Sequence, residues 1–139
     1  MESILIDAGP IIALFDKDDR FHDQIKEFLK NNHYTLITTW AVVTEVCHML
    51  DFSVQAQVAF LEWTERGAVE IVDIKPSSLK RLIELTKKYH DVPMDLADGS
   101  LIILAEIRNI KKIITIDSDY YVYRTIRNEY LENIFEIVK

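Results

Sequence analysis

Residues 4–10, which read ILIDAGP, decide the fold of this chain, because three large apolar residues there run into an aspartate and a turn. Residues 3–7 have the length and composition of a short buried strand. Pro10 suits the first turn of a following helix, where its missing N–H group does no harm. The stretch therefore predicts a buried strand that leads directly into a short helix.

The same alternation of short apolar strands and helices continues along the chain. Further strands are predicted at 35–38, 69–72, 113–116 and 134–138, and helices at 20–31, 40–51, 53–66, 76–89 and 95–109. The last of these helices is apolar on almost every side, which predicts a central position. The pattern is typical of an α/β fold, a single-domain α/β/α sandwich with a central parallel sheet of four to five strands over residues 1–139.

Composition and charge limit the class of protein. The chain has 139 residues, of which 49% are hydrophobic and 28% are charged, as in a globular domain with a real core. No run approaches about 18 apolar residues and the N-terminal residues lack a basic region, so we expect no membrane span, no signal peptide and a cytoplasmic location. The net charge of −7 disfavours broad nucleic-acid binding, although a clustered acidic site that binds cations would account for part of it.

Four carboxylates lie at the edges of apolar segments. Asp7 ends the first predicted strand, and Asp117 ends the strand at 113–116. Glu45 interrupts the apolar residues of one predicted helix, and Asp98 opens the apolar run of the central helix. Carboxylates are rarely buried unless they are paired or bind a metal. Four of them in such positions indicate a shared acidic site.

These four side chains should converge at one edge of the sheet. The carboxyl ends of parallel strands meet at the same edge, and the helices that follow the strands begin there. Two further acids lie close to this set in the sequence, Asp95 one helical turn before Asp98 and Asp119 two residues after Asp117. Both are predicted to be secondary or alternate ligands.

The types of residue in this set indicate the kind of ion. Carboxylate oxygens without Cys or His favour Mg²⁺ or Mn²⁺ over Zn²⁺. One or two such ions can activate water and stabilise the leaving oxygen when a phosphodiester is cleaved. The alternative, a set of unrelated helix caps and surface carboxylates, stays open at this point.

Four segments together resemble the PIN domain and, within that superfamily, the VapC-type toxin ribonucleases. They are residues 5–10 (LIDAGP), 38–45 (TTWAVVTE), 94–101 (MDLADGSL) and 114–120 (ITIDSDY). The resemblance implies that Asp7, Glu45, Asp98 and Asp117 are the catalytic, metal-binding acids, with Asp119 as a fifth metal ligand. It also implies that Thr115 supplies a hydroxyl near the metal and that Asp95 is a secondary acid.

The same resemblance implies an activity and partners. It implies an endoribonuclease that depends on Mg²⁺ or Mn²⁺, acts as the toxin of a type II toxin–antitoxin pair, forms a homodimer and is blocked by an antitoxin protein. The net charge departs from this pattern, because such toxins often have a more basic surface. A non-catalytic PIN-like protein-binding module and a DNA-directed metal nuclease stay open, since two-metal hydrolysis does not require the 2′-OH.

An aromatic and basic cluster follows Asp119 and has two interpretations. Tyr120, Tyr121 and Tyr123 with Arg124 could stack on the bases of RNA. The same rings could instead pack the loop that contains them, after Asp119, onto the edge of the sheet.

Overall fold

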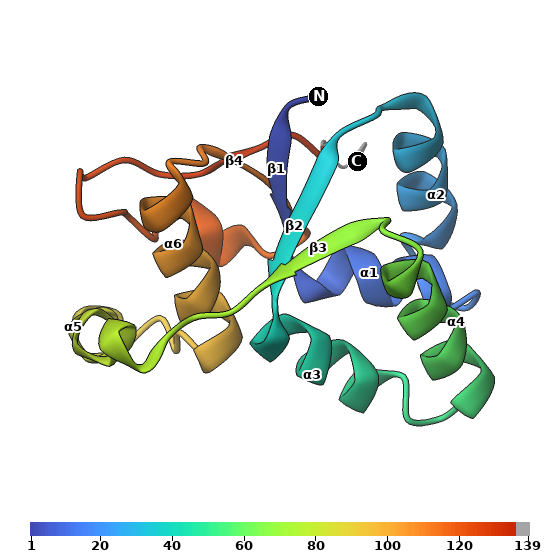
Figure 1. Ribbon diagram of the computed structural model, residues 1–139, viewed down its shortest axis with the longest axis horizontal. Coiled ribbons are helices and arrows are strands. Elements are labelled where there is room, and N and C mark those ends of the chain that lie inside the picture. The colour runs from blue at the N-terminus through green and yellow to red at the C-terminus, as the bar shows by residue number, and fades with distance from the viewer. Residues whose placement is uncertain (136–139) are drawn as a thin grey trace.

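The computed structural model describes residues 1–135, and in this part of the chain five parallel strands form one sheet. The strands are β1 (Ser3–Ile6), β2 (Thr35–Thr39), β3 (Val69–Val72), β4 (Lys112–Ile114) and β5 (Glu132–Asn133). Their order across the sheet is β3-β2-β1-β4-β5, so the first strand lies at its centre (Figure 1). The predicted parallel sheet of four to five strands is confirmed.

Helices cover both faces of this sheet. They are α1 (Ala8–Phe15), α2 (His22–Asn31), α3 (Trp40–Met49), α4 (Val54–Glu65), α5 (Leu79–Lys88) and α6 (Leu96–Arg108), with short 3₁₀ turns η1 (Pro76–Ser78) and η2 (Ser118–Tyr121). Figure 1 shows α5 and α6 on one side of the sheet and α1, α2 and α4 on the other. This arrangement is the predicted α/β/α sandwich. Within residues 1–135, no helix is both long and apolar enough to cross a membrane.

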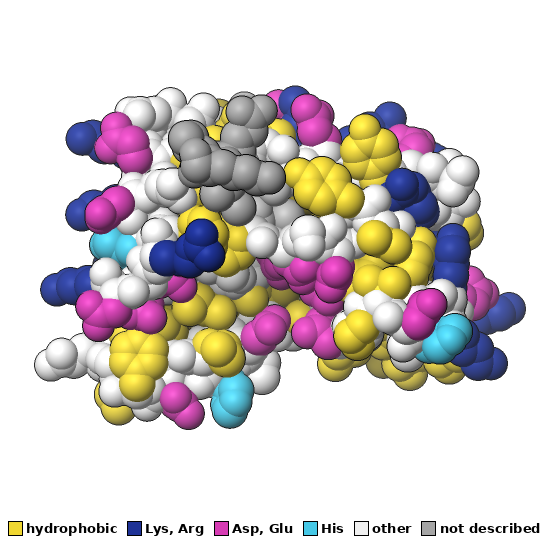
Figure 2. All heavy atoms as spheres, turned by 180° about the vertical axis from the view of Figure 1, so that it is seen from behind, with side chains coloured by type: hydrophobic (Ala, Val, Ile, Leu, Met, Phe, Trp, Pro, Cys, Tyr) yellow, Lys and Arg dark blue, Asp and Glu magenta, His cyan; other side chains and the backbone are white. Residues whose placement is uncertain are grey.

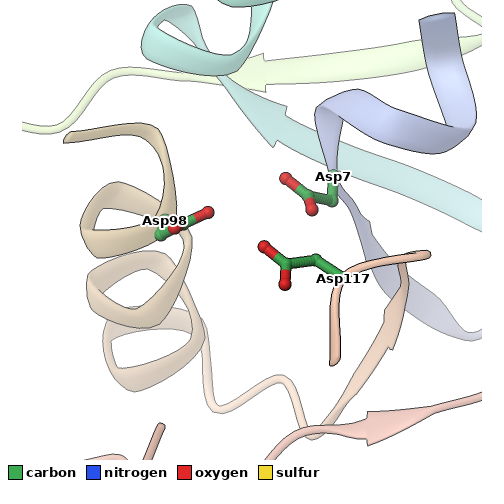
Figure 3. Close-up of side chains that lie close together, drawn as sticks. All are labelled: Asp7, Asp98 and Asp117. Atoms are coloured by element: carbon green, nitrogen blue, oxygen red, sulfur yellow. The ribbon is translucent and has the colours of Figure 1, made fainter. Parts of the chain in front are cut away.

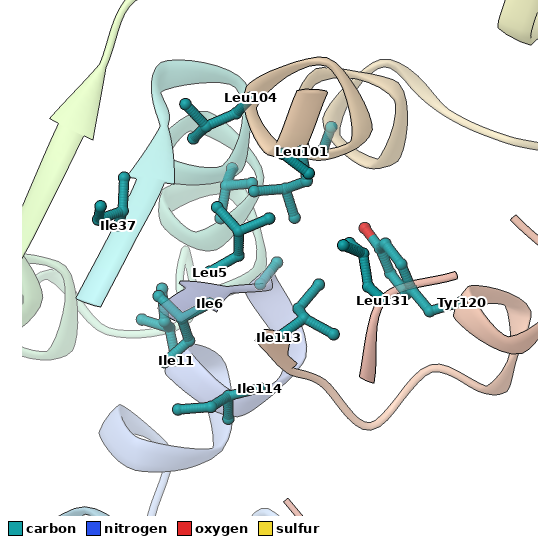
Figure 4. Packing of buried hydrophobic residues seen from close by; sticks show 14 of the residues in the cluster. Leu5, Ile6, Ile11, Ile37, Leu101, Leu104, Ile113, Ile114, Tyr120 and Leu131 are labelled. Atoms are coloured by element: carbon teal, nitrogen blue, oxygen red, sulfur yellow. The ribbon is translucent and has the colours of Figure 1, made fainter. Parts of the chain in front are cut away.

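The core lies between the central strands and the helices on either side. Leu5 and Ile6 of β1 are fully buried, and Figure 4 shows them near Leu101 of α6 and Ile11 of α1. The run from Ala97 to Ala105 in α6 is buried without interruption, which confirms the predicted central position of this helix. The apolar sequence of α6 is therefore explained by contact with neighbours on almost every side.

Two features hold α6 closely against α5. A Cβ atom added at Gly99 would lie 2.7 Å from Cδ1 of Leu82, so the absence of a side chain permits the close approach. Arg81 of α5 donates three hydrogen bonds from Nε and Nη2 to the Glu106 carboxylate of α6, the shortest at 2.7 Å. These contacts fix the helix whose first turn carries Asp98.

The last two strands are shorter or placed earlier than predicted. We predicted strands at 113–116 and 134–138, whereas β4 ends at Ile114 and β5 consists of Glu132 and Asn133. The side chain of Asn133 accepts from the Thr115 N–H group (3.2 Å) and donates to the Thr115 carbonyl (3.0 Å). Side-chain bonds therefore take the place of strand pairing beyond Ile114. Residues 136–138 of the predicted strand lie outside the described residues.

Candidate metal centre

Three of the predicted acids converge at one edge of the sheet. One carboxylate oxygen from each of Asp7, Asp98 and Asp117 lies within 4.8 Å of those of the other two. Figure 3 shows the three carboxylates pointing toward one another from separate elements. Asp7 directly follows β1, Asp117 follows β4, and Asp98 lies in the first turn of α6. Asp7 and Asp98 are buried and Asp117 is half-buried.

The pairing of β1 with β4 brings two of these acids together. Ile6 lies opposite Ile114, and the Asp7 N–H group donates to the Ile114 carbonyl at 3.0 Å. The buried hydroxyl of Thr115 donates to Oδ2 of Asp7 at 2.9 Å and accepts from the Asp117 N–H group at 3.0 Å. A single hydroxyl therefore links the acids that follow the two strands.

Asp98 is placed by a helix cap and by two tyrosines. Its N–H group donates to Oδ1 of Asp95 at 2.8 Å, which makes Asp95 the N-cap of α6. Its own carboxylate accepts from the hydroxyl of Tyr120 at 3.1 Å and from that of Tyr123 at 3.3 Å. Asp95 is exposed and does not belong to the group of three converging carboxylates.

Glu45 and Asp119 lie beside the three converging acids. Glu45 is half-buried on α3, and its charge raises the pKa of Asp7. Burial, followed by the charges of Asp95 and Asp117, raises the pKa of Glu45 itself. The N–H group of Asp119 donates to Oδ1 of Asp117 at 2.9 Å. The structure thus places both acids near the centre, but their oxygens are not part of the group within 4.8 Å.

Among residues 1–135, no basic side chain forms an ion pair with the converging carboxylates. Burial is the main cause that raises the pKa of Asp7 to about 7, although hydrogen bonds from the Ala8 backbone and Thr115 oppose it. Burial also raises the pKa of Asp98 to about 7, reinforced by the charge of Asp7. A bound cation would favour the ionised form of such clustered carboxylates and offset their mutual repulsion.

The donor set fits a hard divalent cation. It consists of carboxylate oxygens, the ligands that Mg²⁺ and Mn²⁺ prefer, and no Cys or His is among them. Figure 2 shows acidic side chains gathered near the middle of one face, beside a notch in its lower edge. Oxygen ligands and uncompensated negative charge are therefore found together at this edge of the sheet.

The cluster that follows Asp119 is divided between the core and the surface. Tyr120 and Tyr123 are buried, which favours the core interpretation for both rings, whereas Tyr121 is 59% exposed. The Arg124 guanidinium donates to the Tyr121 carbonyl at 2.7 Å and lies over the ring of Tyr130. The hydroxyl contacts of the two buried tyrosines with Asp98 were not predicted from the sequence. Tyr in place of Phe at two buried positions was the available signal, since a buried hydroxyl requires a partner.

The family model described as PIN domain matches residues 4–125, which is most of the chain. The chain belongs to the PIN domain family. The match includes Asp7, Glu45, Asp98, Asp117 and Thr115, and it spans the acidic centre and nearly all of strands β1 to β4, while β5 lies outside it. The recognition made from the four sequence segments is confirmed at this level.

Named relatives of this PIN domain include VapC proteins. The chain is 23% identical over 120 residues to Ribonuclease VapC26 of Mycobacterium tuberculosis, covering 85% of this chain and 89% of the relative. The fold is similar to that of VapC20 of the same organism, a sarcin–ricin loop cleaving toxin, with a TM-score of 0.77 and 16% identity over 86% of this chain and 93% of that one. It also resembles a chain of VapBC2 from Rickettsia felis bound to a promoter DNA fragment, with a TM-score of 0.64 and 17% identity over 94% and 98% of the two chains.

Thr115→Val is expected to destabilise the metal-free PIN domain at pH 8 by about 1–3 kcal/mol, because a buried charged acceptor loses its donor and the Asp117 N–H group loses its acceptor. The substitution keeps the shape of the side chain and removes only the hydroxyl. Because the hydrogen bond from Thr115 lowers the pKa of Asp7, the variant should also raise that pKa. Urea unfolding and carboxyl NMR titration measure the two effects, with Thr115→Ser as the control that keeps the hydroxyl. Unchanged values in the Val variant would contradict the prediction.

Proposed function

We propose that this PIN domain is a metal-dependent endoribonuclease that cleaves RNA phosphodiester bonds at the acidic centre, with Mg²⁺ or Mn²⁺ as cofactor. The observation that carries the proposal is the convergence of Asp7, Asp98 and Asp117 from three separate elements without a basic partner in residues 1–135. The similarity to Ribonuclease VapC26 over 85% of the chain supports RNA as the substrate.

Each residue of the centre has a proposed role. Asp7, Asp98 and Asp117 would hold the cation, and Glu45 and Asp119 would serve as further ligands or hold a second ion. Thr115 fixes Asp7 relative to Asp117, and Asp95 begins the helix that carries Asp98. When bound, the metal supplies an activated water and stabilises the leaving oxygen. The buried setting of Asp7 and Asp98 keeps their oxygens from bulk water and leaves them available to the ion.

We propose that the chain is the toxin of a type II toxin–antitoxin pair, acts in the cytoplasm, forms a homodimer and is inhibited by an antitoxin protein. The likeness to a chain of VapBC2 supports such a partner. Large apolar side chains are exposed on and between α3 and α4 and are candidates for such contacts. They are Met49, Phe52, Val54, Val58 and Leu61. Light scattering on the purified chain tests the homodimer directly.

The nuclease is tested by incubating pure protein with matched RNA and DNA substrates in Mg²⁺, in Mn²⁺ or in EDTA. We expect cleavage of RNA in either metal, no cleavage in EDTA, and little cleavage of DNA. Cleavage of DNA in preference to RNA would instead establish a DNA-directed metal nuclease. Absence of both cleavage and Mn²⁺ binding would contradict the proposal and favour a non-catalytic protein-binding module.

A further inference from the structure

Two buried phenols hold the carboxylate of Asp98. The hydroxyl of Tyr120 donates to Oδ1 at 3.1 Å, and the hydroxyl of Tyr123 donates to Oδ2 at 3.3 Å. Tyr120 lies in η2, and Tyr123 follows two residues after its end. This is the same segment that brings Asp117 to the centre. The chain after β4 therefore supplies one acid and contacts both oxygens of another.

The aromatic core does not require these two hydroxyls. Tyr120 is 2% exposed and Tyr123 is 0% exposed, and their rings meet edge to face with centroids 5.3 Å apart. Tyr89 extends the stack, with its centroid 5.2 Å from that of Tyr123. Phe could make the same ring contacts without placing a hydroxyl in the interior. Within residues 1–135, the only hydrogen bonds of the two hydroxyls are those to Asp98.

Asp98 differs from its neighbours in how its carboxylate is held. Asp7 accepts from the hydroxyl of Thr115, and Asp117 accepts from a backbone N–H group two residues later. In the described part of the chain, the Asp98 carboxylate has hydrogen bonds only from the two phenols. Each carboxylate oxygen has two lone pairs. One phenol on each oxygen therefore orients the group and leaves a lone pair on each oxygen available.

A phenol is also suited to this task by its charge. A Lys or Arg side chain would orient the carboxylate equally well, but its positive charge would compete with a cation for the same oxygens. A neutral hydroxyl donates a hydrogen bond and leaves the negative charge of the centre intact.

We propose that Tyr120 and Tyr123 are positioning residues that orient the Asp98 carboxylate toward Asp7 and Asp117 and thereby set the affinity of the centre for a divalent cation. The inference rests on the proposed metal site and adds to it residues that do not touch the ion. Groups that orient metal ligands typically change metal affinity by about 10–100-fold when they are removed.

The test is a calorimetric titration with Mn²⁺ of the parent protein, Tyr120→Phe, Tyr123→Phe and the double variant. We expect the Kd for Mn²⁺ to rise about 10–100-fold in the double variant and by less in each single variant. Tyr89→Phe is the matched control, because it removes a hydroxyl from the same aromatic stack without removing a contact to Asp98. The Tyr89 hydroxyl instead accepts from the Arg124 backbone N–H group at 2.8 Å. Its Kd should stay within about twofold of the parent value.

A second readout separates positioning from packing. If the phenols act through the metal, the Mn²⁺ concentration that gives half-maximal RNA cleavage should rise by the same factor as the Kd, and saturating Mn²⁺ should restore the rate. A folded double variant with a lower Tm and an unchanged Kd would overturn the inference, and if the double variant does not fold, unchanged Kd values in both single variants would do so. If the parent protein itself bound no Mn²⁺, the proposed function would be overturned as well. The titration of the parent therefore distinguishes failure of the metal site from failure of the positioning role.

Discussion

Asp7→Asn is expected to reduce metal-dependent RNA cleavage by about 10³-fold or more, which corresponds to about 4 kcal/mol of activation free energy. The same substitution should increase the free energy of unfolding of the metal-free protein at pH 8. Asp7 is 5% exposed and lies beside Asp98 and Asp117, so its charge is desolvated and repelled. Asn can still accept from the Thr115 hydroxyl, and its amide can donate to the neighbouring carboxylates. The variant therefore lacks one metal-binding carboxylate, which lowers cleavage. It also no longer buries a repelled charge, which raises the free energy of unfolding.

The opposite signs of the two effects make the prediction specific. Single-turnover cleavage at saturating Mg²⁺ measures the first effect, and urea unfolding in EDTA measures the second. Asp51→Asn, at an exposed acid between α3 and α4, is the control and should change neither value appreciably. A carboxylate that stabilised the fold by an ion pair would behave differently, because its removal would lower stability and leave cleavage unchanged. Either of those results in Asp7→Asn would contradict the assigned role.

The convergence of Asp7 and Asp117 could be predicted from sequence because it depends only on local pattern and topology. An apolar run of strand length followed by an acid places that acid near the carboxyl end of the strand. Asp98 could be placed almost as well, since the helix that begins there is apolar on nearly every side and must lie in the core. These three acids are the ones that the structure brings within 4.8 Å of one another.

The position of Glu45 depends on information that the local pattern lacks. The sequence placed it on a predicted helix that begins at the edge of the sheet where the other acids were expected. The distance from its carboxylate to the others depends on how α3 packs against its neighbours, and this is a tertiary property. The structure leaves Glu45 half-buried beside the centre. Its role as a metal ligand therefore stays a prediction.

The ends of the later elements depend on contacts between residues distant in sequence. The side chain of Asn133 bonds to the backbone of Thr115, 18 residues earlier, and β4 ends there. The stretch after Asp117 forms the 3₁₀ turn η2, where Tyr120 reaches back to Asp98 across 22 residues. Side-chain hydrogen bonds of this kind have no periodicity that a sequence pattern can reveal. That one domain spans all of residues 1–139 also stays a prediction.

The stability of the metal-free protein is expected to fall as the pH rises from about 4 to about 8. Burial raises the pKa values of Asp7 and Asp98 from 3.8 to about 7 in the folded protein. Between these pH values the folded state therefore binds more protons than the unfolded state, and the free energy of unfolding decreases with pH. Below about pH 4 both states are protonated and the penalty is absent. Above the folded pKa the penalty is complete, with an upper limit of about 4 kcal/mol for each carboxyl.

A divalent cation should reverse this dependence. Protons compete with the metal for the carboxylates, so Mn²⁺ binds more tightly as the pH rises and stabilises the folded state by about 2.7 kcal/mol when its concentration is 100 times Kd. Urea unfolding at pH 5, 6, 7 and 8, in EDTA and in Mn²⁺, measures both slopes. The double variant Asp7→Asn with Asp98→Asn is the control, because it retains every other titrating group and should lose both dependences. If stability in EDTA did not fall with pH in the parent, the two carboxyls would not share an uncompensated site. A slope that is negative in EDTA and positive in Mn²⁺ would show that the buried charge, which destabilises the empty fold, is the charge that binds the metal.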